Sequence, residues 1–454
     1  MIPAHVHLVG IGGIGLSAIA RLLLARGVRV SGSDQTASPI TDALARLGAQ
    51  IAIGHRAENL GDAELVLVTS AAPAENPEVI AARQRGVRVV KRYDFFPELT
   101  AGKKTIAIAG THGKTTTTAL IAALLIDAGR DPDVIVGGIV PELGGNARAG
   151  QGEYFVIEAD EYDRAFLGLQ PTIAVITNIE MDHPDIFADV QEVARAFRAF
   201  MLLVPPHDGI IVGCGDSPLV AREFDALLGR WYVPYGFGDD NSWRADNVTP
   251  TADGGNAFRV WRGETHIGEF ALKIPGAHNV LNALAAITVA GQLNLDWDGV
   301  RATLANFRGA ARRFEITSEL GGVTIIDDYA HHPTKIRATL AAARTRFPER
   351  VIWAVFQPHT FSRTLALSAE FARAFDDADH VLVTEIYPAR EQNVRGISGA
   401  LIVDQMAHAD ARFIPTLETC VEFLAAQVRA GDIVITLGAG DVNRVGQWLA
   451  QTRG

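Results

Sequence analysis

The sequence predicts a three-domain α/β protein whose sheets are mostly parallel and covered by helices. Its 454 residues correspond to about three domains, at roughly 150 residues per domain. Short β-branched runs alternate with helical patterns along most of the chain, which is typical of parallel sheets. Residues 231–274 change to short alternating runs rich in Gly, Asp and Asn, which predict antiparallel strands at the edge of one sheet.

The composition fits a folded protein and argues against several classes of function. Hydrophobic residues make up 48% and charged residues 20% of the chain, so extensive disorder is not expected. Lys and Arg number 41 against 52 Asp and Glu, a net charge of −11, which argues against a broad basic surface for nucleic acid or anionic membrane. A local phosphate site stays compatible with this charge, because it needs only a few backbone amides and one or two cations.

The expected location is the cytoplasm. The two cysteines, Cys214 and Cys420, cannot form a disulfide framework, which favours a reducing compartment. Residues 2–20 carry no Lys, Arg, Asp or Glu, but they contain His5, His7 and four ordered glycines, and no basic segment precedes them. We therefore expect a strand and a turn there instead of a signal peptide, and no membrane insertion.

The first predicted domain is Rossmann-like and spans residues 1–102. Its expected helices, 16–26 and 40–47, each end near a glycine that can cap them. The polar segment 98–104 separates this domain from the next apolar strand. The strands are expected at 6–9, 28–31, 50–53, 65–69 and 87–90.

A glycine-rich turn follows the first expected strand. Gly10, Gly12, Gly13 and Gly15 fit the pattern G-x-G-x-x-G between a strand and a helix, where backbone amides can approach a diphosphate. Asp34 follows Gly15 by 34 − 15 = 19 residues, near the place of the acid that binds a ribose hydroxyl in dinucleotide enzymes. The motif indicates a diphosphate but not its carrier, so a nicotinamide cofactor and a nucleotide sugar both stay open.

The central predicted domain, residues 103–315, opens with a phosphate-binding loop at 110–116. Amides in such a loop wrap phosphate oxygens, Lys114 neutralises the β/γ region, and the Thr115 hydroxyl can bind Mg²⁺. The longer consensus has a glycine where Ile108 stands, so the match is partial. The flanking strand and helix are expected at 105–109 and 114–128.

Two acidic segments end later strands of the central domain. Glu158, Asp160 and Glu161 follow one expected strand, and Asp182 and His183 follow the next. The carboxyl ends of parallel strands meet along one crevice, where such sheets bind ligands. Because Mg²⁺ prefers oxygen ligands, one or two of these carboxylates with the loop threonine suffice for a metal site, while the histidine would ligate a second ion or orient a ligand. The strands are expected at 134–136, 154–158, 173–177 and 210–212.

A long helix is expected at 279–292, preceded by the segment PGAH. His278 and Asn282 lie on one face of it at i, i+4 spacing. Asn279 has two interpretations, as the N-cap of the helix or as a residue that reads an adenine edge, since an Asn side chain both donates and accepts.

The third predicted domain, residues 316–454, is Rossmann-like again. Polar segments follow three of its strands, so one crevice can gather them. The paired His331 and His332 suit either a metal site or substrate contacts. The polar segments are 327–334, 357–364 and 438–441. The strands are expected at 323–327, 351–356, 380–384 and 433–437. The helices are expected at 333–346 and 363–375.

Taken together, these motifs resemble the Mur ligase family of ATP-dependent amide ligases over essentially the whole chain. The resemblance rests on HLVGIGGIGLSAIA, SGSD, AGTHGKTTTT, EADEYDRAFL, TNIEMDHPD, PGAHNVLNA, GAARRFE, DDYAHHPT, FQPHTFSRT and LGAGD. It implies a Rossmann-like first domain for a UDP-sugar, a central P-loop ATPase-type domain with antiparallel edge strands, and a Rossmann-like third domain for an amino acid.

The resemblance also implies a reaction. It is the ATP-dependent joining of L-alanine to UDP-N-acetylmuramate through an acyl phosphate in peptidoglycan precursor synthesis, by a monomer or homodimer. Two Mg²⁺ ions are expected, with Mn²⁺ as a substitute. The alternative within the family attaches a recycled tripeptide to the same UDP-sugar. Outside it, a nicotinamide-dependent oxidoreductase leaves the phosphate loop unexplained, and an ATP-dependent switch would form no amide.

The resemblance implies site residues in each domain. Those expected to bind ATP are Gly110, Thr111, His112, Gly113, Lys114, Thr115, Thr116, Asn279, Asn282, Arg313 and Asp327. Those expected to face the UDP-sugar are Gly10, Gly12, Gly13, Gly15, Asp34, His55, Ser70 and Arg92. Tyr329, His359 and Arg363 are expected on the amino-acid side.

Four of the implied residues are expected to take part in catalysis: Lys114, Glu158, His183 and His332. Thr115 and Glu158 would hold one Mg²⁺, and Glu158 and His183 the second. Some relatives carry Arg where this chain has Thr360, which leaves Arg363 as the better candidate for the carboxylate of alanine.

Overall fold

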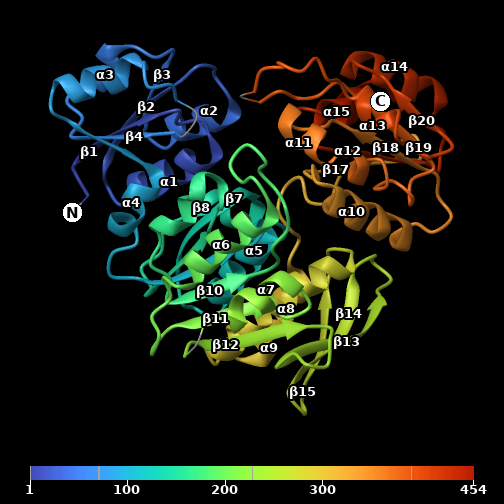
Figure 1. The fold of residues 1–454 in the computed structure, drawn as a ribbon, viewed down its shortest axis with the longest axis horizontal. Helices are drawn as coiled ribbons and strands as arrows, with labels where there is room; N and C mark the ends of the chain where they lie inside the picture. Colours follow the sequence, from blue (N-terminus) through green and yellow to red (C-terminus); the bar gives the residue numbers. More distant parts are fainter. Residues whose placement is uncertain (1, 70–71, 228, 390, 454) are drawn as a thin grey trace.

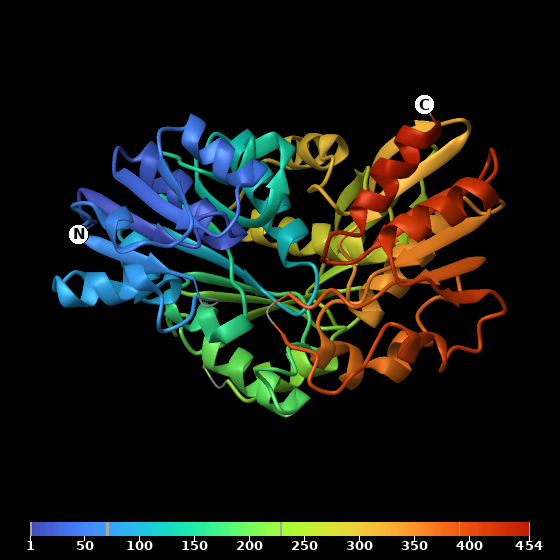
Figure 2. The same ribbon diagram turned by 90° about the horizontal axis from the view of Figure 1, so that it is seen from above.

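The computed structural model describes residues 2–69, 72–227, 229–389 and 391–453, and these form three sheets in chain order. The first and third domains lie above the central one in Figure 1. Figure 2, seen from above, shows them on opposite sides of the molecule. The predicted fold class, a three-domain α/β protein, is confirmed.

The first sheet has the order β3-β2-β1-β4-β5, and all its pairings are parallel. Ser38 caps α2 by accepting from the Thr41 amide, with proline at the first helical position. Two of its helices, α3 and α4, were not predicted; α4 carries an internal Pro97 and extends into the expected boundary segment. The strands are β1 (His5–Val9), β2 (Arg29–Asp34), β3 (Gln50–Ile53), β4 (Leu65–Val68) and β5 (Arg88–Lys91), and the helices are α1 (Ile14–Ala25), α2 (Pro39–Arg46), η1 (Ala57–Leu60), α3 (Pro77–Gln84) and α4 (Arg92–Leu99).

The central sheet has the order β15-β14-β13-β12-β11-β10-β6-β9-β7-β8. Antiparallel pairing is confined to its two edges, β13-β14-β15 and β7-β8. Its strands are β6 (Lys104–Ala109), β7 (Asp133–Val140), β8 (Gly145–Arg148), β9 (Tyr154–Glu158), β10 (Ile173–Ile176), β11 (Ile210–Cys214), β12 (Trp231–Gly236), β13 (Trp243–Pro250), β14 (Asn256–Arg262) and β15 (Thr265–Leu272). Its helices are α5 (Lys114–Asp127), η2 (Pro141–Leu143), η3 (Tyr162–Gly168), α6 (Val190–Met201), α7 (Pro218–Asp225), α8 (Ala277–Gln292) and α9 (Trp297–Asn306).

Two details of the central domain differ from the prediction. The expected antiparallel stretch began at residue 231, but β12 is parallel to β11 because helix α7 makes a crossover connection between them. The helix expected from Asn279 begins at Ala277, with Gly276 as its N-cap. Asn279 lies inside the first turn, so its interpretation as the N-cap is wrong.

The third sheet has the order β16-β17-β21-β18-β19-β20, antiparallel only between β16 and β17. The helix expected at 363–375 is two short helices, because the chain leaves helical geometry at Leu367. The strands are β16 (Glu315–Leu320), β17 (Val323–Asp328), β18 (Ile352–Phe356), β19 (His380–Val383), β20 (Ala411–Phe413) and β21 (Ile433–Leu437), and the helices are α10 (Pro333–Arg346), α11 (Phe361–Ala366), α12 (Ser368–Phe371), α13 (Ala400–Val403), α14 (Leu417–Gln427) and α15 (Asn443–Arg453).

Inner strands such as β1, β6, β10 and β21 are buried on both faces, as parallel sheets covered by helices require. Both cysteines belong to these cores, and burial raises the pKa of Cys214 to about 11 and of Cys420 to about 12. No helix in the described ranges has the length and apolar character needed to cross a membrane.

Candidate active site

Two cavities meet at the phosphate loop. The P-loop cavity, about 160 Å³, lies between the loop, α8 and α10. The three-domain cavity, about 390 Å³, is lined from all three domains, by Gly15 and Arg92, by Lys114, Glu158 and His183, and by His331, His359 and Arg363. The fold therefore brings the predicted nucleotide loop, the N-terminal glycine turn and the third-domain motifs to one place.

The phosphate loop connects β6 to the N-terminus of α5, where unpaired amides and the helix dipole favour an anion. Two of its glycines are sterically required. A Cβ on Gly110 would lie 1.9 Å from Thr177 Oγ1, and one on Gly113 would lie 2.3 Å from Asn282 Oδ1. The His112 amide donates to Asn178 Oδ1 at 2.8 Å, which holds the loop against the segment that follows β10.

Lys114 points into the three-domain cavity. Its Nζ lies 2.7 Å from Glu161 Oε2 and donates to the Gly110 carbonyl at 2.6 Å. Burial alone would lower the pKa of Lys114, but the carboxylates of Glu161, Asp160 and Glu158 outweigh it and raise that pKa. The lysine is therefore held as a cation beside the phosphate loop.

Thr115 and Glu158 form an oxygen pair at the same point. Thr115 Oγ1 donates to Glu158 Oε1 at 3.1 Å, and the Gly137 amide donates to the other carboxylate oxygen at 2.6 Å. Arg313 Nη2 donates to Thr115 Oγ1 at 3.2 Å. Burial raises the pKa of Glu158 although Lys114 opposes it. A hydroxyl beside a half-buried carboxylate is a donor set that suits Mg²⁺.

His183 belongs to a neighbouring group. Among the described residues, its ring nitrogen and the carboxylates of Asp160 and Glu161 lie within 4.8 Å of one another. His183 has a left-handed backbone, with φ 54°, which is uncommon for a residue other than glycine and clusters at functional sites. The ring nitrogen lies 3.7 Å from Glu161 Oε1.

His332 has a different setting from the one expected. Its Nδ1 accepts from the Thr334 amide as the N-cap of α10, and its Nε2 lies 3.0 Å from the Met181 carbonyl. It therefore joins the third domain to the central one. Thr334 does the same, because its hydroxyl donates to Glu180 Oε2 at 2.7 Å. The adjacent His331, and not His332, is among the residues that line the three-domain cavity.

The far end of the P-loop cavity is polar. Asn282 Nδ2 donates to Asn279 Oδ1 at 3.1 Å, and both line the cavity with Arg313. Asp327 does not line it in the described structure, because its carboxylate binds Arg312 Nε at 2.8 Å and the Thr436 hydroxyl at 2.7 Å. The neighbouring Asp328 lines the cavity in its place.

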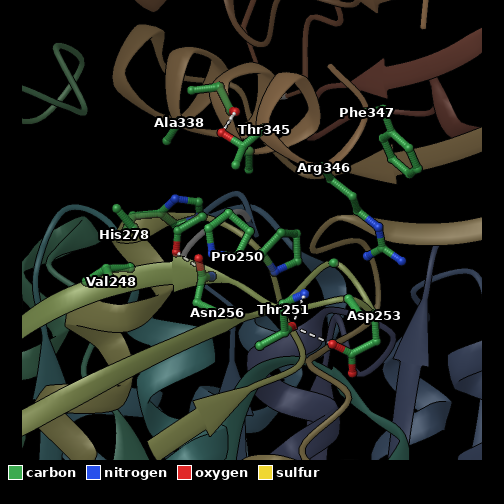
Figure 3. A pocket seen from close by; sticks show the side chains of 18 residues that line it. Val248, Pro250, Thr251, Asp253, Asn256, His278, Ala338, Thr345, Arg346 and Phe347 are labelled. Carbon is green, nitrogen blue, oxygen red and sulfur yellow. Dashed lines mark hydrogen bonds between the residues drawn. The ribbon is translucent and has the colours of Figure 1, made fainter. Parts of the chain in front are cut away.

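A wider cavity of about 680 Å³ continues from this end (Figure 3). The two cavities share His278 and Ala338. Asn256 and His278 come from the central domain, and Thr345 and Arg346 face them from α10. Burial lowers the pKa of His278 to about 4, so the ring is neutral at pH 7.

The glycine turn of the first domain is held by a side chain of the same domain. Asp34 Oδ2 accepts from the Gly12 amide at 2.9 Å, so this carboxylate fixes the turn. Gly10 has φ +82° and Gly13 is the N-cap of α1. A Cβ on Gly15 would lie 2.7 Å from Arg92 Nη1, so these two predicted residues do adjoin.

The other predicted UDP-sugar residues are His55 and Ser70. His55 Nδ1 lies 2.9 Å from the Ser33 hydroxyl and 3.3 Å from the fully buried carboxylate of Glu78. Burial would raise the pKa of Glu78, but the nearby His7 ring and hydrogen bonds from Ser33 and Asn59 lower it to about 2. Ser70 lies outside the described residues.

The three predicted amino-acid residues gather in the three-domain cavity. Tyr329 lies under Arg313, 5.2 Å from its guanidinium, and His359 stacks on Tyr387 at 5.7 Å. Arg363 lines the cavity while its Nη2 lies 2.7 Å from Asp182 Oδ1.

Family models match all three domains of the chain. Residues 5–104 match "Mur ligase family, catalytic domain", residues 108–290 match "Mur ligase middle domain", and residues 312–440 match "Mur ligase, glutamate ligase domain". The chain belongs to the Mur ligase family. The predicted family is therefore confirmed, and with it an ATP-dependent ligase fold.

Several proteins of known name match the chain over nearly its full length. A UDP-N-acetylmuramate–L-alanine ligase of Oleidesulfovibrio alaskensis is 46% identical over 98% of this Mur ligase and 98% of its own length. One from Nitratidesulfovibrio vulgaris is 45% identical over 97% of both chains. The solved UDP-N-acetylmuramate–alanine ligase of Thermotoga maritima has a TM-score of 0.84 at 32% identity, covering 99% of this chain and 98% of that one. A murein peptide ligase of Psychrobacter arcticus has a TM-score of 0.75 at 25% identity, covering 100% and 99%.

Sequence reasoning gave no role to Asp328 or Lys335, which line the cavities, and it left His331 open between a metal site and substrate contacts. Each is a direct neighbour of a residue or motif that was singled out. Register decides which of two adjacent side chains faces a cavity, and the sequence pattern of a polar loop carries no periodicity that would fix it.

Proposed function

We propose that this Mur ligase joins L-alanine to UDP-N-acetylmuramate with the consumption of ATP, in peptidoglycan precursor synthesis. The observation that carries the proposal is the three-domain cavity, because it unites the phosphate loop with the glycine turn of the first domain and the polar loops of the third. The relatives with 41–46% identity over nearly the full chain carry the name of this reaction.

The chemistry follows from the charges at the phosphate loop. The lactyl carboxylate of the sugar attacks the γ-phosphorus of ATP, which gives an acyl phosphate and ADP. The amine of alanine then attacks the acyl carbon, and the tetrahedral intermediate expels phosphate. An anion that attacks a polyanion needs positive charge to offset repulsion, and Lys114 supplies it together with the dipole and first amides of α5.

Mg²⁺ fits the hydroxyl–carboxylate pair of Thr115 and Glu158, which would hold one ion. The group of His183, Asp160 and Glu161 suits a second ion, with Mn²⁺ as a substitute, and the sequence-based assignment of Glu158 with His183 to that ion stays a prediction. When bound, the metal supplies positive charge at the transferring phosphoryl group.

Each outer domain brings one substrate to the shared cavity. Gly15 and Arg92 belong to the UDP-sugar side, and His359 and Arg363 to the alanine side. Enclosure by three domains would keep water from the acyl phosphate, which hydrolyses readily. The boundaries 1–102, 103–315 and 316–454, a cytoplasmic location, and a monomeric or homodimeric state are part of the proposal.

A product assay tests the proposed function. The purified chain is incubated with UDP-N-acetylmuramate, ATP, Mg²⁺ and a panel of amine acceptors, and products are separated by mass. We expect ADP, phosphate and the alanine adduct in equal amounts. Nucleotide turnover without an amide product, or a hydride-transfer signal with a nicotinamide cofactor, would contradict it.

A further inference from the structure

Lys335 is a cation that none of the roles above uses. It lies in the first turn of α10, in the third domain, and its side chain lines both the P-loop cavity and the three-domain cavity. Of the described residues, Thr115 and Arg313 are the other two that line both. Lys335 therefore lies where the two cavities join.

The other cations of the three-domain cavity are already bonded. Arg313 donates to the Thr115 hydroxyl. Within the described part of the chain, Lys335 Nζ has no hydrogen-bond or ion-pair partner. Each of the remaining three forms an ion pair at 2.7 Å, namely Arg92 with Asp160, Lys114 with Glu161 and Arg363 with Asp182. Within the described residues, Lys335 and Arg313 are thus the cations of this cavity that no carboxylate pairs with, and the Lys335 ammonium has no bond to give up to an incoming anion.

Among the charges that act most strongly on Lys335, three cations (Arg313, Lys114 and Arg363) stand against one carboxylate, Asp182. Burial first, and then the guanidinium of Arg313, lower the pKa of Lys335 to about 7, although Asp182 opposes them. A half-buried ammonium among cations is stabilised by an anion that arrives beside it. Such a site favours a multiply charged ligand over a neutral one.

We propose that Lys335 is a catalytic residue that contacts the phosphoryl group during its transfer from ATP to the sugar carboxylate. This inference rests on the proposed function. In the step, a carboxylate oxygen bonds to the γ-phosphorus while the bond to the β–γ bridging oxygen breaks, and its electron pair leaves with ADP. No proton moves, and Lys335 offsets negative charge on the phosphoryl oxygens.

The position of Lys335 at the junction of the two cavities favours contact with the phosphoryl group over contact with the carboxylate of alanine. Lys335 shares the P-loop cavity with Gly113, Thr115 and Thr116, residues of the phosphate loop and its helix. The expected alanine-side residues Tyr329 and His359 line only the other cavity within the described structure. Because Lys335 comes from the third domain, phosphoryl transfer would require contact between that domain and the central one.

The test uses Lys335→Met, with Lys335→Arg to restore the charge and Arg337→Met as the control. Arg337 is an exposed cation in the same turn of α10 that lines neither cavity in the described structure. Acyl phosphate formed without L-alanine is trapped with hydroxylamine, and the KM for L-alanine is measured separately. We expect Lys335→Met to slow trapping at least ~10²-fold, the effect of losing one electrostatic stabiliser, with Lys335→Arg recovering part and Arg337→Met near wild type.

The outcomes separate this inference from the proposed function. If the wild-type protein forms no alanine adduct, the proposed function itself is wrong. An active wild type with normal trapping in Lys335→Met overturns only the role of Lys335. Normal trapping with a raised KM for L-alanine also overturns it, and assigns Lys335 to the acceptor. If Lys335→Met melts early, Lys335→Gln provides a second neutral side chain for the same comparison.

Discussion

Arg363 of the third domain and Asp182 of the central domain form a buried ion pair, with Arg363 Nη2 2.7 Å from Asp182 Oδ1. Arg363 Nε donates to the same oxygen at 2.8 Å, and each side chain is 4% exposed. Asp182 precedes His183, so the pair holds the third domain against the loop that carries this candidate metal ligand. The expected alanine contact of Arg363 therefore shares a guanidinium that already joins two domains.

Arg363→Ala should lower both stability and activity. Removing one partner of a buried pair leaves an uncompensated charge, which costs about 3–5 kcal/mol. The double variant Asp182→Asn with Arg363→Ala removes that charge and should recover much of the Tm. If Arg363 also binds the carboxylate of alanine, the KM for L-alanine stays raised in the double variant while the KM for ATP does not. A double variant with a normal KM for L-alanine would assign Arg363 to domain docking alone.

Lys114→Ala should cut kcat by at least ~10²-fold, because one cation that meets the phosphoryl group is lost. Its ion pair with Glu161 means that the variant also leaves a buried carboxylate without its lysine, so the Tm must be recorded beside kcat. The control is Lys104→Ala, at the opposite end of β6, where an exposed lysine pairs with Glu153. Near-normal turnover in Lys114→Ala would exclude the loop as the phosphate site.

Glu158→Gln tests the oxygen pair with Thr115. The amide keeps an oxygen that can accept from the Gly137 amide but loses the negative charge, so Mg²⁺ should bind more weakly. We expect a steep fall in activity that partly recovers when the Mg²⁺ concentration is raised. An unchanged Mg²⁺ dependence would place the metal elsewhere, with Asp160 or Glu161 as the next candidates.

Much of the fold was predictable, because each inner strand is a short apolar run between polar turns. The strands at Gln50–Ile53, Tyr154–Glu158 and Ile433–Leu437 and the helix at Pro333–Arg346 have the expected bounds. The direction of β12 was not predictable, since a short strand has the same local pattern in either direction and the crossover helix decides it.

The position of a candidate site residue was predictable where a loop connects a strand directly to a helix, as at Gly110 to Thr116. It was less so where a bond across domains decides which way a side chain points. His332 is held by the Met181 carbonyl, and Asp327 is held by Arg312. Because these partners are not local neighbours in the sequence, the spacing of residues does not predict the two bonds.

We expect the third domain to determine which amine the enzyme accepts. L-alanine and the recycled tripeptide both present a free amine, so the third domain must choose between them by size and charge. The alanine side of the three-domain cavity is bounded by His331, His359 and Arg363, and its guanidinium is already paired with Asp182. Such a place suits a short zwitterion and leaves an extended acidic peptide without room or countercharge. We therefore expect L-alanine to be preferred and the tripeptide to be essentially unused. Gly and L-Ser should be slower by a modest factor, because one methyl group in an apolar pocket is worth only about 1–3 kcal/mol.

To test this preference, L-alanine and tripeptide compete in one reaction, and the two adducts are separated by mass. A dominant tripeptide adduct would identify the recycling reaction as the true one, and would mean that the third-domain loops admit a longer acceptor than their lining indicates.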